Sequence, residues 1–220
     1  MSAGIAHEIN SPITIILGSL GLLEKNRNNT EKFSGTSAAI RRAAEKIAYI
    51  VSGLTKFSRR SEYSEKMPHV FSGIVREVVA LQTSTAKIFE VGIDLDLKTD
   101  AHVDCNEIEI AQVLQNLIAN GIDAAKQSRE KWIRINLFED SGELVMQILD
   151  SGPGVPAGME EKIFEPFFTT KPSGNGTGLG LSIVRGIVTD HGASLNLSKV
   201  DGHTCFELRF AIAPKTATAP

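Results

Sequence analysis

Two runs of apolar residues at three- and four-residue spacing open the chain. The first run is Ala6, Ile9, Ile13, Ile16, Leu20 and Leu23, and the second is Ile40, Ala43, Ile47, Ile50, Leu54 and Phe57. This spacing is typical of the narrow apolar seam of a helical bundle. The polar stretch between the runs, residues 26–37, predicts the turn of an antiparallel helical hairpin.

A hairpin of two helices buries little apolar surface by itself. A second hairpin from another copy would complete a four-helix bundle, which predicts a homodimer; packing of the hairpin on the rest of the chain is the alternative. A polar linker over residues 58–68 follows, and Pro68 is poorly placed to continue a helix. We therefore expect one domain over residues 1–62 and a second over residues 63–220.

The second half of the chain mixes helical and strand patterns. Helices are predicted over residues 74–88, 107–126 and 179–190, and strands over residues 92–97, 132–138, 144–149, 194–200 and 205–212. Asp104 or Asn106 is suited to begin the second of these helices, and Gly192 to end the third. Strands that follow one another after a helix indicate an α+β fold, in which helices cover one face of a mainly antiparallel sheet. Residues 153–177 are rich in Gly and Pro and have the length of a lid.

Composition and charge narrow the class of protein. The 220 residues are 42% apolar and 22% charged, with a formal charge of −3, so we expect a globular protein without a nucleic-acid partner. The longest apolar runs are shorter than a membrane-spanning helix, which predicts no membrane segment in this chain. Cys105 and Cys205 fit no CxxC spacing, so reduced thiols in the cytoplasm are expected.

His7 and Glu8 stand out within the first apolar run. Because Ala6 and Ile9 belong to the inward seam, His7 is expected at the accessible edge of the bundle. A neutral imidazole is a competent nucleophile, and an adjacent carboxylate can hold the proton of its other nitrogen. A surface His beside a Glu is commonplace, but Pro12 inside this helix costs roughly 3 kcal/mol and indicates a special role for the segment.

Asn116 and Asn120 are four residues apart on one face of the predicted helix 107–126, with Asp123 about one turn further. Oxygen ligands so placed suit Mg²⁺, which combines a few protein oxygens with phosphate oxygens and water. Amides on a helix are as often simply solvated.

Asp150 follows an apolar strand and precedes Gly152 and Gly154. The carboxylate could accept a hydrogen bond from the amino group of a purine, and the glycines would let the backbone approach a flat ligand. Asp and Gly are also the usual residues of a turn, so this motif alone is weak.

A glycine-rich segment opens the last predicted helix. It consists of Gly176, Thr177, Gly178, Leu179, Gly180 and Leu181. Glycines at a helix start expose backbone N–H groups to phosphates, but the spacing is neither that of a P-loop nor that of a Rossmann turn. Phe164 and the residues up to Lys171 lie in the predicted lid, where the aromatic rings either gate the lid or anchor it to the core.

Together these segments resemble the histidine-kinase family, in which a dimerisation and phosphoacceptor hairpin precedes an ATP-binding domain related to those of gyrase B, the heat-shock chaperones and the mismatch-repair ATPases. The segments similar to the family's H, N, G1, F and G2 boxes are residues 7–12, 115–124, 150–154, 164–171 and 176–181. The resemblance covers nearly the whole chain. It implies a dimeric four-helix bundle followed by an α/β sandwich of the Bergerat type.

The resemblance also implies a function and roles for single residues. A sensor histidine kinase core would use ATP and Mg²⁺ to phosphorylate His7, with Glu8 as acid–base partner, and pass the phosphoryl group to an aspartate in the receiver domain of a response regulator. Asn120 would be the principal Mg²⁺ ligand, with Asn116 beside it. The residues implied in nucleotide binding are Asn116, Asn120, Asp123, Asp150, Gly152, Gly154, Phe164, Lys171, Gly176, Thr177, Gly178, Leu179, Gly180, Leu181 and Thr204. Among these, Asp150 would read adenine with the support of Thr204, and Lys171 would face the phosphates.

Three departures from the family pattern are visible. Ser11 stands where many members have Thr or Asn, a position tied to phosphatase activity, and Asp123 stands where many have Lys, so a phosphate contact does not carry over. Only six residues precede His7, which leads us to expect a fragment, such as the cytoplasmic portion of a larger sensor. The alternatives are a nucleotide-binding scaffold without transferase activity and a related clamp-type ATPase.

Overall fold

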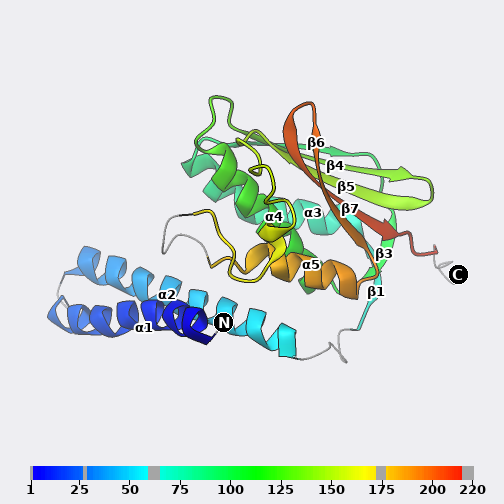
Figure 1. The fold of residues 1–220 in the computed structure, drawn as a ribbon. Helices are drawn as coiled ribbons and strands as arrows, with labels where there is room; N and C mark the ends of the chain where they lie inside the picture. The colour runs from blue at the N-terminus through cyan, green and yellow to red at the C-terminus, as the bar shows by residue number, and fades with distance from the viewer. Residues whose placement is uncertain (1, 27–28, 59–64, 172–176, 215–220) are drawn as a thin grey trace, which may run out of the picture. The chain divides into compact units, whose positions relative to one another are not determined.

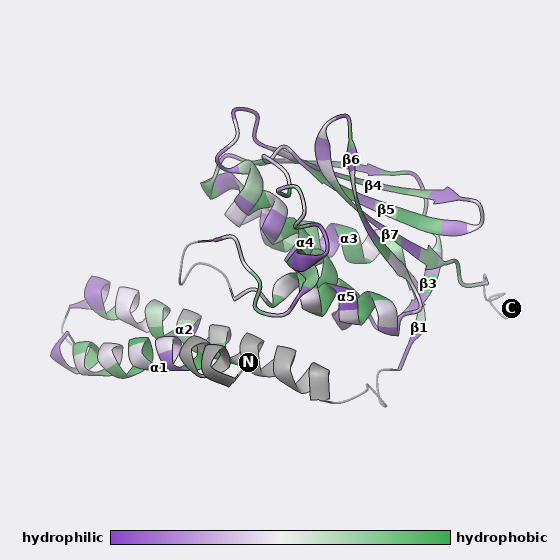
Figure 2. Ribbon diagram, viewed as in Figure 1, coloured by the Kyte–Doolittle hydropathy of each residue, from purple (hydrophilic) through white to green (hydrophobic). Residues whose placement is uncertain are grey.

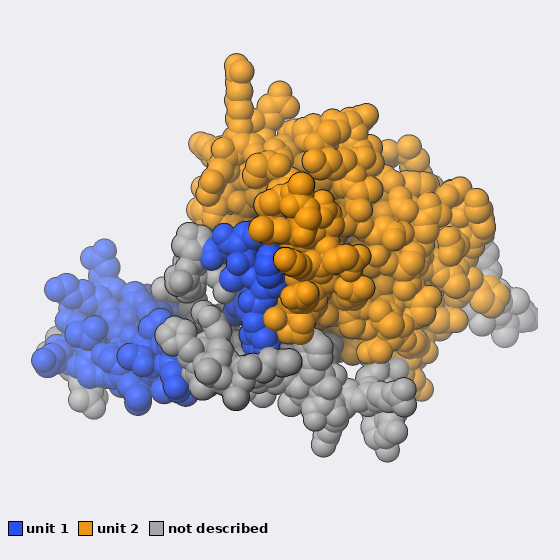
Figure 3. Space-filling view, viewed as in Figure 1, with its two compact units in different colours: residues 1–62, 167–179 blue, residues 63–166, 180–220 orange. Residues whose placement is uncertain are grey.

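The computed structural model describes residues 2–26, 29–58, 65–171 and 177–214. Within these ranges, the side chains of residues 2–8, 24, 42, 45, 46 and 48–58 lie outside the description. The chain forms two compact units, one of residues 1–62 with 167–179 and the other of residues 63–166 with 180–220 (Figure 3).

The first unit contains the predicted helical hairpin, formed by α1 (Ser2–Lys25) and α2 (Thr30–Ser58), which pack along each other (Figure 1). The predicted turn over residues 26–37 is wrong at its far end, because α2 already begins at Thr30. The Asn29 side chain accepts a hydrogen bond from the Lys32 N–H at 3.0 Å and so caps the helix. The polar residues that follow are the exposed surface of that helix.

Helix α1 runs through Pro12, which is buried. Several large apolar side chains of α1 remain exposed in the single chain, namely Ile13, Ile15, Leu17, Leu20 and Leu22. Leu17, at 65% exposure, is the most exposed of them. Within the described residues, no helix is both long and apolar enough to cross a membrane.

The second unit is built on a five-stranded mixed sheet with the order β2-β4-β5-β7-β6. Its strands are β2 (Gly92–Leu97), β4 (Trp132–Asp140), β5 (Glu143–Asp150), β6 (Ser194–Val200) and β7 (His203–Ala211). All pairs are antiparallel except β2 with β4, which are parallel because a helical crossover separates them in sequence. The mainly antiparallel sheet expected from the sequence is confirmed.

Three helices cover one face of this sheet: α3 (Phe71–Ile88), α4 (Glu107–Ala125) and α5 (Gly180–Asp190) (Figure 1). Each carries both apolar and polar residues (Figure 2). The core between the two layers includes Leu114, Leu117, Ile118, Ile133, Ile135, Leu137, Leu144 and Met146, all of them almost fully buried. The helices and the sheet therefore form the predicted α/β sandwich.

A second, two-stranded sheet was not predicted. It pairs β1 (Met67–Val70) with β3 (His102–Cys105) in antiparallel register, with Pro68 opposite Asp104. The expectation that residues 58–68 form a linker up to Pro68 is therefore wrong at its end. Proline is tolerated here because β1 pairs with a single neighbour and does not need a second row of N–H donors.

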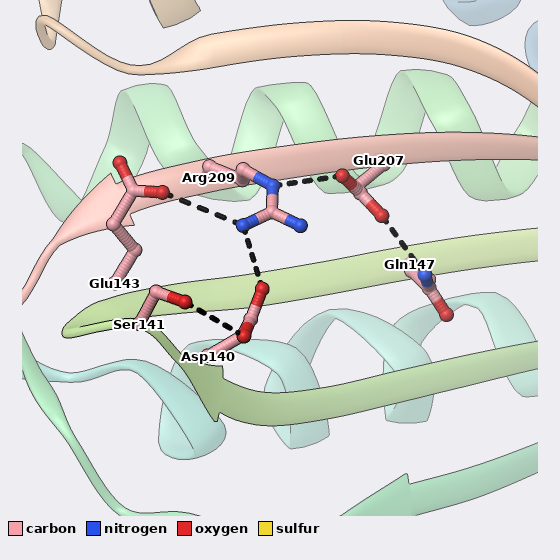
Figure 4. Close-up of polar contacts among 6 residues, drawn as sticks. All are labelled: Asp140, Ser141, Glu143, Gln147, Glu207 and Arg209. Atoms are coloured by element: carbon pink, nitrogen blue, oxygen red, sulfur yellow. Dashed lines mark hydrogen bonds and ion pairs between the residues drawn. The ribbon is translucent and has the colours of Figure 1, made fainter.

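The face of the large sheet that turns away from the helices carries a polar network around Arg209 (Figure 4). Its guanidinium donates to Glu207 at 2.8 Å, Asp140 at 3.0 Å and Glu143 at 3.5 Å. Gln147 donates to the other oxygen of Glu207 at 2.9 Å. Val145 lies opposite Arg209 in the register of β5 and β7 and is fully buried, as expected where long side chains cover an apolar position.

Candidate functional site

Asp150 is the last residue of β5, which is the central strand of the sheet. It lies opposite Ile133 of β4 and opposite Thr204 of β7. Asp150 and Thr204 are each only 5% exposed, which is unusual for polar side chains at the end of a strand. Asp150 and Thr204, which the resemblance places together near adenine, are therefore direct neighbours on the adjacent strands β5 and β7.

The environment of Asp150 disfavours its charged form. Burial raises the pKa of the Asp150 carboxyl, while the hydrogen bond from the Gly152 N–H and the nearby His203 lower it to a smaller extent. The Gly152 bond goes to Oδ1 and measures 2.8 Å. A buried carboxylate of this kind gains from a ligand that donates a hydrogen bond to it.

Two positions after Asp150 favour glycine. One does so because it is closely packed, and the other because of its positive φ. A Cβ on Gly152 would lie 2.5 Å from the Cβ of Ala124 in α4, which leaves no room for a side chain. Gly154 has φ of +84°, and a Cβ there would lie 3.6 Å from Oγ1 of Thr204. The segment 150–154 is therefore pressed between α4 and the start of β7.

Helix α4 brings its asparagines to the same region. Its N-cap is Asn106, one of the two residues expected there, and a Cβ on Gly121 would lie 3.6 Å from the Cβ of Asp150. Asn120, the residue before Gly121, is half-buried. Asn116 donates from Nδ2 to the carbonyl of Gly180 at 3.4 Å, which links α4 to the first residue of α5.

Asp123 has a charged partner at the C-terminal end of α4, and its implied role in nucleotide binding stays a prediction. Its carboxylate forms an ion pair with Lys126, and the Lys126 ammonium also lies 5.4 Å from the centre of the Phe89 ring. The charge of Asp123 is thus offset by a lysine one turn further along the helix. The role of Lys126 was not predicted, although its spacing of three residues from an aspartate on a helix is a recognisable signal in the sequence.

The donor set fits a magnesium ion only together with a ligand. No group of three or more His, Cys, Asp or Glu side chains is placed to hold a metal ion within the part of the chain that the structure describes. Amide oxygens from Asn116 and Asn120 would supply two positions at most. Mg²⁺ commonly takes its remaining oxygens from phosphate and water, so these residues suit an ion that arrives with a phosphorylated ligand.

The glycine-rich segment before α5 is partly described. The N–H of Phe167 donates to the carbonyl of Gly178 at 2.9 Å, and both residues have positive φ, +69° and +65°. Thr177 accepts at Oγ1 from the Leu179 N–H at 3.3 Å. Leu179 is buried, and Gly180 and Leu181 form the first turn of α5. Gly176 lies outside the described residues.

The two ends of the 164–171 segment have different surroundings. The ring of Phe164, at the end of η1 (Lys162–Phe164), meets the edge of Phe206 at a centroid distance of 6.4 Å. The guanidinium of Arg185 lies 5.5 Å from the centre of the Phe164 ring. These contacts favour the anchoring role for Phe164 that was left open. Lys171 donates its backbone N–H to Oγ1 of Thr169 at 3.1 Å.

His7 and Glu8 both lie in α1, but their side chains are outside the described part of the chain. Their roles therefore stay predictions.

A polar pair beside Asp150, formed by Ser151 and Trp132, was not predicted. The hydroxyl of Ser151 accepts from the Trp132 N–H at 3.0 Å, and the Ser151 N–H donates to the Trp132 carbonyl at 3.1 Å. The indole of Trp132 packs edge-on against His203 at 4.7 Å. No local signal reveals this pair, because serine between Asp and Gly reads as an ordinary turn residue.

Two family models match the chain in the order of its two units. The model of the His Kinase A (phospho-acceptor) domain matches residues 1–62, and the model of the histidine kinase-, DNA gyrase B-, and HSP90-like ATPase matches residues 105–214. The chain belongs to the histidine kinase family. The buried Asp150 and helix α4 both lie in the part that matches the ATPase model.

Relatives within the family are long proteins. The chain is 30% identical to the C4-dicarboxylate transport sensor protein DctB of Rhizobium meliloti (strain 1021) and 33% identical to the sensor kinase CckA of Brucella abortus (strain 2308), with 94% of the chain covered in each case. It spans only 33% of the first relative and 23% of the second.

Solved structures of histidine kinases share the fold. The catalytic domain of histidine kinase ThkA is 30% identical, with a TM-score of 0.61 over 67% of this chain and 96% of that one. Histidine kinase AdeS of Acinetobacter baumannii is 23% identical and has a TM-score of 0.72 over 94% of this chain and 98% of that one. The latter likeness covers both units of the chain and concerns the fold alone.

Proposed function

We propose that the chain is the catalytic core of a sensor histidine kinase, which transfers the γ-phosphoryl group of ATP to His7 and then to an aspartate of a response regulator. The observation that carries this proposal is the buried Asp150, held between Thr204 and helix α4 in a domain of the ATPase family. The proposed phosphotransfer domain is residues 1–62, and the proposed ATP-binding domain is residues 63–220.

Adenine recognition follows from the chemistry of Asp150. Its carboxylate is shielded from water, and its Oδ1 already accepts from Gly152. The second oxygen would accept the hydrogen bond of the adenine amino group, with Thr204 alongside. Gly154 keeps the neighbouring surface free of side chains, so a flat ring can approach the backbone.

The triphosphate would lie toward the asparagines of α4. Asn120, with Asn116 beside it, would orient the phosphates through a magnesium ion, which when bound spreads the negative charge that develops in phosphoryl transfer. The backbone N–H groups of Gly178 and Gly180, with Lys171, are proposed to face the same phosphates.

Transfer of the γ-phosphoryl group would occur in two steps. A neutral nitrogen of His7 attacks the γ-phosphorus, the bond to the β-phosphate oxygen breaks, and ADP leaves; Glu8 accepts the proton from the other imidazole nitrogen. A carboxylate oxygen of the regulator then attacks the phosphorus, the P–N bond to His7 breaks, and the imidazole regains its proton from Glu8.

The expected partners are a second copy of the chain and a response regulator. The exposed apolar side chains of α1, among them Leu17 and Leu22, would be covered in a dimeric four-helix bundle. Histidine kinase ThkA has been solved in complex with the response regulator protein TrrA; this chain is 26% identical to it, with a TM-score of 0.69 over 98% of this chain and 62% of that one.

The test is incubation with γ-labelled ATP and Mg²⁺. The chain should acquire label that is acid-labile and alkali-stable, His7→Ala and Asn120→Ala should lose it, and His69→Ala should keep it as the matched control. Label retained by His7→Ala would overturn the assignment of the phosphoacceptor. Hydrolysis of ATP without a labelled protein would point to a clamp-type ATPase, and ATP binding without label or hydrolysis to a scaffold.

A further inference from the structure

The strand that ends in Asp150 is fixed by an unusual pair of hydrogen bonds. In an antiparallel ladder, opposite residues of a hydrogen-bonded pair exchange two backbone N–H···O bonds. The row after Ile133 and Asp150 pairs Trp132 with Ser151, and here only one bond joins backbone to backbone, at 3.1 Å. The other runs from the Trp132 N–H to the Ser151 hydroxyl at 3.0 Å. The side chain of Ser151 thus takes the place of a carbonyl.

Because the Ser151 hydroxyl replaces a backbone carbonyl as acceptor, the chain can leave the sheet directly after Asp150. Gly152 lies close to α4, where an added Cβ would come within 2.5 Å of the Ala124 Cβ, and its N–H donates to Oδ1 of Asp150. If the backbone carbonyl of Ser151 had to pair with Trp132, the strand would continue straight. With the hydroxyl as acceptor, the N–H of Trp132 stays satisfied and the turn begins directly after Asp150.

The partner of Ser151 is itself held firmly. The indole of Trp132 lies against His203 at 4.7 Å and against the guanidinium of Arg134 at 5.2 Å. His203 begins β7, the strand that supplies Thr204. The hydroxyl of Ser151 therefore bonds the end of β5 to Trp132 of β4, whose indole contacts the first residue of β7.

We infer that Ser151 is a positioning residue for base recognition: its hydroxyl fixes the turn that aims the Asp150 carboxylate at the adenine amino group. This inference rests on the proposed function, since it concerns the same nucleotide site. It assigns Ser151 to the selection of the base, not to the phosphates or to the transfer step.

The test compares Ser151→Ala with Ser151→Thr, because threonine keeps a hydroxyl at the same position. The binding of ADP and of GDP is measured by calorimetry, and thermal unfolding is followed in parallel. Ser151→Ala should bind ADP about 5- to 20-fold more weakly, the scale of one lost hydrogen bond, with little change for GDP. Ser151→Thr should recover most of the ADP affinity. Ser141→Ala, which removes an exposed turn hydroxyl bonded to Asp140, is the matched control and should bind both nucleotides like the wild type.

The selectivity ratio separates positioning from a loss of folding. A decrease in the preference for ADP over GDP that threonine restores supports the inference. Equal weakening of both nucleotides, or an unchanged preference in Ser151→Ala, overturns it while leaving the proposed function intact. A wild-type chain that binds neither nucleotide would overturn the proposed function, and the role of Ser151 with it.

Discussion

Nε2 of His191 accepts the backbone N–H of Asn106 at 3.1 Å. Because this nitrogen accepts, the proton resides on Nδ1, which donates to the carbonyl of Ile187 at 2.8 Å. The side chain of His191 is fully buried. A single neutral imidazole therefore joins the C-terminal end of α5 to the N-cap of α4.

His191→Leu should destabilise the fold. The substitution leaves the partly buried Asn106 N–H without its acceptor, which costs about 1–3 kcal/mol. The Ile187 carbonyl still accepts the backbone N–H of residue 191 at 3.0 Å. Urea unfolding would measure the free energy of unfolding. His69→Leu is the control: the side chain of His69 is partly exposed, 3.9 Å from Glu107, and its loss should cost less than about 1 kcal/mol. Equal stability of His191→Leu and the wild type would contradict the structural role.

Asp150→Asn should separate binding from stability. Burial raises the pKa of Asp150 in the folded chain, so its favourable contribution is complete below the unfolded pKa and is lost as pH rises through the folded pKa. At pH 7, above the unfolded pKa, this contribution is reduced or lost, so the asparagine variant without nucleotide should melt at the same or a higher temperature. The difference should shrink toward pH 4.

The same variant should bind ADP about 10- to 100-fold more weakly, since a hydrogen bond to a charged group contributes about 1.5–3 kcal/mol. Calorimetry would measure this. Asp94→Asn, on the exposed surface of β2, is the matched control and should leave affinity unchanged. Undiminished ADP affinity in Asp150→Asn would show that another residue reads the base.

Arg209→Met should change how stability depends on pH. The hydrogen bonds of Arg209 and of Gln147 lower the pKa values of Asp140 and Glu207 respectively, with Arg209 also acting on Glu207. Groups with depressed pKa values contribute stability above their unfolded pKa and lose it as pH falls. The variant should therefore be less stable than the wild type at pH 7 and approach it near pH 3.

Unfolding by urea at several pH values would test this. Arg76→Met, on the exposed surface of α3, serves as control and should run parallel to the wild type. A constant difference between Arg209→Met and the wild type at every pH would mean that the arginine acts through packing alone.

Gly152→Ala should disturb both the fold and the site. Its Cβ would lie 2.5 Å from the Cβ of Ala124 and 2.6 Å from Oδ1 of Asp150. Such overpacking costs about 1–3 kcal/mol, and the displaced carboxylate should weaken ADP binding. Gly186→Ala is the contrasting variant, since nothing lies within 4 Å of a Cβ there. In the interior of α5 it should stabilise by about 0.5–1 kcal/mol. Thermal unfolding of both variants would check the opposite signs.

The elements that could be predicted from the sequence are those whose ends depend on residues within or directly beside the element itself. Helix α4 begins at the expected place because the Asn106 side chain accepts from the Glu109 N–H at 3.0 Å, a bond within one turn. The bounds of β2 and β6 agree with the alternation of apolar residues in their own sequences. By contrast, β1 and β3 are only four residues long each and form strands because they pair with each other.

The candidate site, too, could be predicted from the sequence only in part. The residue types of the Asp150 and Asn120 motifs are visible in the sequence, and resemblance supplied Thr204. That Thr204 lies opposite Asp150 depends on the register between β5 and β7, which no local pattern determines. The bond from Trp132 to Ser151 depends on the register between β4 and β5 for the same reason.

The order of strands in the large sheet also bears on how the protein is made. The last strand in sequence, β7, is inserted between β5 and β6. A ribosome-bound chain that still lacks β7 therefore has β5 as an open edge, with the apolar residues from Leu144 to Leu149 unpaired on one side. Thr204, which lies opposite Asp150, belongs to β7 and leaves the ribosome with it. Until β7 has left the ribosome, the nascent protein can neither close this sheet nor complete the proposed base-reading site.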